Sequence, residues 1–235
     1  MRIICLADTH GVHLDLDIPD GDVLVFAGDV TRDGTIGEVV YFNAWLGTMP
    51  HKRKIVVAGN HDFCFQSRQE ECRRILTNAD CLHDSSTIVD GVKFHGSPFQ
   101  PWFHDFAFNL PRGPKLAEVW RRVPKNTDVL VTHCPPMGIL DKTTLGNHEG
   151  CADLMARIRQ LNIRLHVFGH IHERYGTVMN GGIQFVNASI ADKGFKMVNN
   201  PITVTLDVSV VRPGKQPGRA GFKALNRLFP PIHKA

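Results

Sequence analysis

Short apolar stretches recur along the chain, and five of them end directly before a small cluster of aspartate, asparagine or histidine. These stretches are residues 3–7, 23–27, 55–58, 129–131 and 165–168. Buried parallel strands are continuous apolar runs of this kind. In open α/β sheets, ligands bind just outside the carboxyl ends of the strands. The pattern therefore predicts an α/β fold in which the five polar clusters meet at one site.

The segments between these runs predict the remaining elements. Apolar residues at helical spacing predict helices over residues 35–48, 70–78, 115–122 and 151–161. In the first helix we expect Val39, Val40, Phe42, Trp45 and Leu46 to face inward. Hairpins are predicted to turn at Gly91 and at 180–182, and a last strand over 201–208. The first sixty residues thus predict a β-β-α-β unit with right-handed connections.

Composition favours one soluble domain. The chain has 235 residues, of which 43% are hydrophobic and 21% charged, which excludes a disordered or fibrous protein. No apolar run approaches the roughly 18 residues that span a bilayer, and no signal-peptide pattern follows Met1. The six cysteines contain no C-x-x-C pair, which fits reduced thiols. We expect a cytoplasmic protein with no membrane partner, whose oligomeric state stays open.

The positive charge lies at the C-terminal end. The net charge is +4, but residues 212–235 hold six basic residues and no acidic one, so the rest is slightly acidic. We therefore divide the chain into a domain over 1–211 and a basic tail over 212–235. Apolar residues within 220–229 predict a short helix that docks on the domain. The alternative is a basic arm for nucleic acid, an anionic membrane surface or a partner protein.

The five clusters carry donor groups that suit metal ions. The candidate ligands are Asp8, His10, Asp29, Asn60, His133, His170 and His172. Seven oxygen and nitrogen donors are too many for one tetrahedral zinc, but two ions such as manganese, iron, zinc or nickel would use them if one carboxylate bridged the pair. Such a pair can hold a hydroxide and stabilise in-line displacement at phosphorus. With two carboxylates its charge is about +2, which would attract an anionic phosphate ester.

Other polar residues fit this pattern less well. The segment Gly146-Asn147-His148-Glu149 resembles the Gly59 cluster but follows polar residues, so we expect a surface loop near the rim of the site. We expect His95, His104 and His166 to be structural or solvated, although His104 could touch substrate. The aromatic segment 96–113 predicts a binding loop that stacks on a base or aryl group, or a packed hydrophobic lid.

Together with GSPFQPWF at 96–103, FNLPRG at 108–113, THCPP at 132–136 and GHIHERYG at 169–176, these clusters resemble the calcineurin-like metallophosphoesterase superfamily. The similarity is closest to its small metallophosphoesterase-domain-containing, or UPF0046-like, branch and covers most of residues 1–208. The resemblance implies a four-layer α-β-β-α sandwich with two mixed β-sheets. It also implies a dinuclear metal site at the C-terminal strand ends.

The resemblance further implies a role for each site residue. One ion would take Asp8, His10, Asp29 and His172, and the other would share Asp29 and take Asn60, His133 and His170. His61 would face the ester and protonate the leaving oxygen while Asp62 orients its ring, and a bridging hydroxide would attack phosphorus directly. Substrate contacts would come from Asn60, His61 and Arg112. Manganese is the first expectation for the metal, with iron, zinc, nickel or cobalt as alternatives. Cys134 replaces an expected glycine without changing this ligand set.

The reaction expected from these features is hydrolysis of phosphodiesters, with small cyclic, nucleotide or aryl diesters as substrates. We favour diesters because Asn60 and His61 need not bind a second charged phosphate oxygen. One alternative is a nuclease or repair phosphoesterase whose basic tail binds the nucleic-acid backbone. Another is a catalytically silent metal-binding scaffold of the same fold, against which the presence of His61 and all seven candidate ligands argues.

Overall fold

The computed structural model describes residues 1–208, in which two β-sheets face each other. The first sheet has the order β13 (Ile202–Thr205), β1 (Arg2–Leu6), β2 (Val23–Ala27), β3 (Arg53–Val57), β4 (Asp80–Cys81). The second has the order β11 (Gly176–Asn180), β12 (Ile183–Asn187), β10 (Leu165–Phe168), β9 (Val129–Thr132), β6 (Val92–Ser97), β5 (Ser85–Val89). Both sheets are mixed, because β13, β11 and β5 each run antiparallel to their neighbours while the other pairs are parallel.

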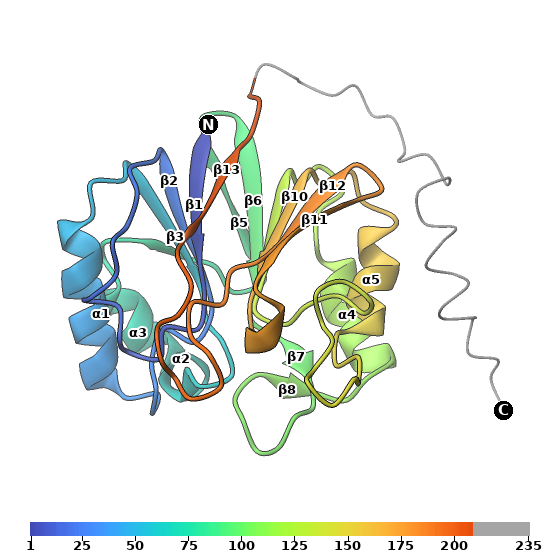
Figure 1. The fold of residues 1–235 in the computed structure, drawn as a ribbon, viewed down its shortest axis with the longest axis horizontal. Helices are drawn as coiled ribbons and strands as arrows, with labels where there is room; N and C mark the ends of the chain where they lie inside the picture. The colour runs from blue at the N-terminus through green and yellow to red at the C-terminus, as the bar shows by residue number, and fades with distance from the viewer. Residues whose placement is uncertain (209–235) are drawn as a thin grey trace, which may run out of the picture.

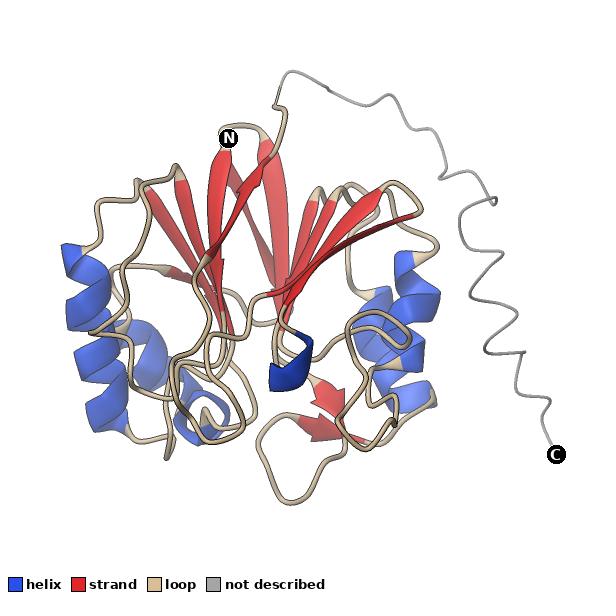
Figure 2. Cartoon of the chain, viewed as in Figure 1, coloured by secondary structure: helices blue, strands red, loops and turns tan. Residues whose placement is uncertain are grey.

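Helices cover the outer face of each sheet (Figures 1 and 2). The first sheet carries α1 (Ile36–Thr48), α2 (Phe63–Ser67) and α3 (Gln69–Ile75), and the second carries α4 (Pro114–Arg121) and α5 (Ala152–Ile158). Below the second sheet, β7 (Gln100–Pro101) pairs with β8 (Asn109–Leu110), and the 3₁₀ helix η1 (His172–Arg174) follows β10. One buried apolar cluster lies between the sheets and one lies under each helix layer. The expected four-layer α-β-β-α sandwich is confirmed.

Local chemistry explains where the helix α1 begins and which face it buries. Thr35 accepts from the backbone N–H of Glu38, and the Glu38 carboxylate accepts from the backbone of Thr35, which is a capping box. Val39, Phe42, Trp45 and Leu46 are buried as expected. Val40 is 49% exposed, so its predicted inward position was wrong. One residue advances the helix by about 100°, which turns Val40 away from the face that Val39 buries.

Several short elements were not predicted. The helix α2 precedes α3, and the strands β4, β7 and β8 have two residues each, too few for a periodic pattern. The last strand covers only 202–205 of the predicted 201–208. The predicted tail helix over 220–229 and the domain boundary at 211 lie outside the described residues. Within residues 1–208 no helix combines the length and the apolar character needed to cross a membrane.

His166 is a buried histidine in the middle of β10. Its ring lies 4.9 Å from the ring of Phe168 and 5.9 Å from that of Phe185. The Thr132 hydroxyl donates to the Cys134 carbonyl, so it accepts from His166 Nε2–H at 2.8 Å. Burial lowers the pKa of His166 to about 3. His166 is therefore a structural residue that stays neutral in the folded protein.

This burial predicts acid sensitivity. Between pH 6.5 and about pH 3 the unfolded chain protonates His166 while the native state does not, so stability falls as the pH drops below 6.5. One such histidine contributes a slope of about 1.4 kcal/mol per pH unit. The variant H166F should therefore lose stability less steeply than wild type on acidification, as measured by urea unfolding across this range. Above about pH 7.5 the free energies of unfolding of wild type and H166F should differ by a constant amount, which reflects the lost hydrogen bond. A constant difference over the whole pH range would contradict the prediction.

Candidate metal centre

The five polar clusters meet at one end of the two sheets. The strands β1, β2 and β3 are parallel in the first sheet, and β9 and β10 are parallel in the second. Beyond β1, the backbone of Ala7 pairs with Ser189, which joins the sheets where the strands end. These strands end at the lower side of the two sheets in Figure 1, so the loops that carry the candidate ligands meet there.

Asp29 lies between the two predicted ligand sets. Its Oδ2 atom is 3.8 Å from Nε2 of His10 and 3.4 Å from Nε2 of His133. Its other oxygen, Oδ1, accepts from the backbone N–H of His61 at 2.8 Å. One carboxylate oxygen thus faces a histidine from each set, which is the position a bridging ligand requires.

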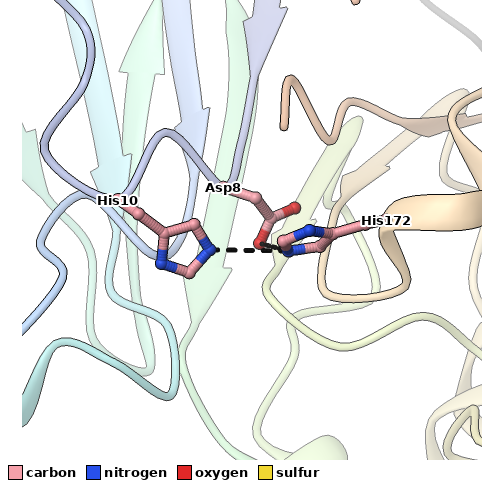
Figure 3. Close-up of side chains that lie close together, drawn as sticks. All are labelled: Asp8, His10 and His172. Carbon is pink, nitrogen blue, oxygen red and sulfur yellow. Dashed lines mark hydrogen bonds and ion pairs between the residues drawn. The ribbon is translucent and has the colours of Figure 1, made fainter. Parts of the chain in front are cut away.

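Asp8, His10 and His172 form the first group, with their donor atoms turned toward one another (Figure 3). Nε2 of His172 lies 3.4 Å from Nε2 of His10 and 3.7 Å from Oδ1 of Asp8. Nδ1–H of His172 donates to the Asp192 carbonyl at 2.9 Å, which leaves the lone pair of Nε2 facing the group. Oδ1 of Asp8 is buried and has no hydrogen-bond partner among the described residues. A cation at this point would satisfy that oxygen, so the residues fit a metal ion.

Asn60, His133 and His170 form the second group. The Asn60 side-chain oxygen lies 2.8 Å from Nε2 of His133 and 2.8 Å from Nδ1 of His170. Nδ1–H of His133 donates to the Ala27 carbonyl at 3.0 Å, so in the neutral ring Nε2 would present a lone pair to the Asn60 oxygen. Two facing lone pairs repel unless a proton or a metal cation lies between them. This donor set also fits a metal ion.

The electrostatics of the centre favour positive charge. Burial disfavours ionisation of Asp8, yet His172 and His133 hold the pKa of Asp8 at about 2. Burial also opposes protonation of His133, but Asp29 and Asp8 raise the pKa of His133 to about 9. These carboxylates are therefore ionised, and they attract either protons or metal ions to the histidines around them.

The backbone is unusual at four of the seven candidate ligands. The φ angles are 57° at Asp8, 45° at His10, 54° at Asp29 and 71° at His170. Residues other than glycine rarely adopt such positive values, and those that do gather at functional sites. Glycine is needed beside them for a different reason: a Cβ atom on Gly59 would lie 2.3 Å from Oδ1 of Asp29. The ligand loops therefore pack too closely for any other residue there.

His61 and Asp62 do not form the predicted contact. Nδ1–H of His61 donates to the Arg32 carbonyl at 3.0 Å, which leaves Nε2 for the cavity. The buried Asp62 carboxylate instead accepts from the backbone N–H groups of Gly59 and Thr31, at 2.7 and 2.8 Å. Burial and the nearby Asp29 raise the pKa of Asp62 to about 6. The expectation that Asp62 orients the His61 ring was wrong, because Asp62 holds two ligand loops together.

A cavity of about 310 Å³ opens over both groups. It is lined by His10, Asp29, Asn60, His61, Phe103, Thr143, Glu149, His170, Ile171, His172, Glu173, Lys193 and Phe195. Glu149 confirms that the 146–149 loop reaches the rim. Arg112 is not one of the described residues that line the cavity. Its guanidinium donates to the carbonyls of Gly150 and Glu149, at 2.7 and 3.1 Å, so it supports the rim loop in place of the predicted phosphate contact.

Sequence reasoning assigned no role to five of the lining residues: Thr143, Ile171, Glu173, Lys193 and Phe195. Lys193 and Phe195 come from the segment 188–201, which joins β12 to β13 and shows no period. An isolated aromatic residue among polar ones was the single local signal for Phe195. Cys134, which replaces the glycine expected from the family resemblance, is buried in the core under α4 and α5, and burial raises the pKa of its thiol.

The chain is similar to proteins of one family. A family model described as calcineurin-like phosphoesterase matches residues 1–174. Metallophosphoesterase domain-containing protein 1 of Homo sapiens is 40% identical over 230 residues, covering 87% of this chain and 71% of that protein. UPF0046 protein K07C11.7 of Caenorhabditis elegans is 38% identical over 217 residues, covering 86% and 74%. The crystal structure of TT1561 of Thermus thermophilus has a similar fold, with a TM-score of 0.53, 16% identity and coverage of 79% and 88%.

Proposed function

Because the chain belongs to the calcineurin-like phosphoesterase family, we propose that it hydrolyses phosphodiesters with two divalent metal ions bound at the strand ends. The observation that carries this proposal is the position of Asp29 Oδ2 between His10 and His133. Asp8, His10 and His172 would hold one ion, Asn60, His133 and His170 the other, and Asp29 both. When bound, the ions, of which manganese is our first choice, would supply Lewis acidity and activate water for attack at phosphorus.

His61 supplies the proton in this proposal. The Arg32 carbonyl binds Nδ1–H, so Nε2 is the nitrogen that faces the cavity. A proton on Nε2 can pass to the leaving oxygen as the ester bond breaks. The Arg32 carbonyl thus takes the positioning role that the family resemblance implied for Asp62.

The charges around the cavity favour a diester. Glu149 and Glu173 both line it. Lys193 contributes a positive charge to the cavity lining. Its Nζ lies 2.7 Å from Oε1 of Glu173, so this charge is already paired. A monoester dianion would place a second negative charge near these carboxylates, whereas a diester carries one. The lining therefore supports small cyclic, nucleotide or aryl diesters over monoesters.

Turnover of two chromogenic esters tests the proposal. With manganese added, bis(4-nitrophenyl) phosphate should have a kcat/KM roughly tenfold or more above that of 4-nitrophenyl phosphate, a difference of about 1.4 kcal/mol in the barrier. A chelator should abolish both activities, and manganese should restore them. Higher activity toward the monoester would contradict the diester assignment. Absence of turnover by metal-loaded protein would instead favour the silent-scaffold alternative, while the nucleic-acid alternative rests on residues 212–235, outside the described part.

A further inference from the structure

Phe195 covers the first ligand group from the segment between β12 and β13. Its ring centroid lies 4.5 Å from that of His10, 6.0 Å from that of His61 and 6.3 Å from that of His172. Its backbone has a φ of 59°, which a bulky aromatic residue rarely adopts. A strained conformation at such a place persists only where the surroundings impose it.

The residues that hold Phe195 also orient the histidines below it. The Arg32 guanidinium lies 5.4 Å from the ring centroid of Phe195, while the Arg32 carbonyl accepts from His61. On the other side of the loop, the Asp192 carbonyl accepts from His172. The Asp192 carboxylate accepts from the backbone N–H groups of Gly194 and Lys196, at 2.8 and 3.0 Å, and so closes the turn around Phe195. The ring is therefore a built part of the site.

Phe103 occupies the matching position over the second group. Its ring lies 5.8 Å from that of His170 at an interplanar angle of 90°. The Asn109 side chain accepts from the backbone N–H of Phe103 and donates to its carbonyl, both at 3.2 Å. Phe106 stacks against Phe103 at 5.8 Å and 8°, and its ring is 4.8 Å from that of His61. The aromatic loop is thus held in place, and Phe103 is its one residue that lines the cavity.

We propose that Phe103 and Phe195 form an aromatic clamp that selects phosphoesters carrying a planar aromatic group over those carrying only small alkyl groups. The proposal rests on the proposed function, which places the phosphate over Asp29 between the two rings. Aromatic rings bury large apolar areas and prefer edge or offset contact with one another. An aryl group or a base can use both phenyl rings, whereas a methyl group offers little area to either. The clamp therefore narrows the diester class to aromatic esters.

Binding of two phosphonates to manganese-loaded protein tests the clamp without turnover. By calorimetry, wild type should bind phenylphosphonate roughly tenfold more tightly than methylphosphonate, which corresponds to about 1.4 kcal/mol. F103A and F195A should each remove most of this preference, because each should lower the affinity for phenylphosphonate much more than the affinity for methylphosphonate. F195W should keep the preference. W102A is the matched control, because Trp102 adjoins Phe103, is 62% exposed and does not line the cavity.

Two results would overturn the clamp. One is a wild type that binds both phosphonates equally. The other is a pair of variants, F103A and F195A, that lose affinity for both ligands alike, because that is what general damage to the site would produce. Failure of the proposed function is separately visible: protein that prefers phenylphosphonate but hydrolyses neither nitrophenyl ester would keep the clamp and lose the phosphodiesterase activity.

Discussion

Replacing Asp29 by alanine should remove both bound metal ions and reduce phosphodiester turnover to the level of the metal-free protein. Oδ2 of Asp29 faces His10 at 3.8 Å and His133 at 3.4 Å, so a single substitution removes a negative ligand from both groups. Losing an outer-shell partner of a metal ligand costs about 10–100-fold in affinity, and losing a shared ligand should cost more. Metal content after dialysis, measured by atomic emission, and turnover of bis(4-nitrophenyl) phosphate give the result.

A second variant separates loss of charge from loss of fold. D29N keeps the shape of the side chain and an oxygen that can accept from the His61 backbone, yet it lacks the negative charge. It should fold and still bind metal weakly. D33A is the matched control, because Asp33 is close in sequence and exposed. Retention of two ions by D29A would contradict the bridging role.

Replacing His61 by alanine should lower turnover by about 10²–10⁴-fold, the range typical of general acid catalysis, while both metal ions stay bound. His61 faces the cavity with Nε2 and is held through Nδ1 by the Arg32 carbonyl, outside both proposed ligand sets. Turnover and metal content measured on the same sample test both halves of this expectation.

The leaving group provides a sharper readout for His61. A nitrophenolate leaves without much help from an acid, whereas an unsubstituted phenolate needs a proton. Phenyl 4-nitrophenyl phosphate can lose either group. With this substrate, H61A should reduce the rate of phenol release more than the rate of nitrophenol release. His61 also lies near His10 and Asp29, with donor atoms within 4.8 Å of one another. Loss of a metal ion in H61A would show that His61 is a ligand and would contradict its role as an acid.

Much of the fold could be predicted from local pattern. Strands buried on both faces are continuous apolar runs, and β1, β2 and β3 were placed within a residue or two on that basis. Val40 shows the limit of this approach, since an apolar side chain next to the buried stripe of α1 can still face solvent. The strand β4 could not be found because its two residues are held by pairing with β3, which is a tertiary contact.

The sequence by itself determined which donor groups this protein brings to the strand ends, because parallel strands carry whatever follows them to one edge of the sheet. It could not determine how those groups are used. The tertiary structure decided three features of the site. Asp29 lies between the two ligand groups, Arg32 rather than Asp62 binds the His61 ring, and Phe195 covers the histidines. All three depend on contacts between segments far apart in the chain, and Asp29 and Phe195 also adopt rare backbone angles. Neither feature leaves a periodic signal in the sequence.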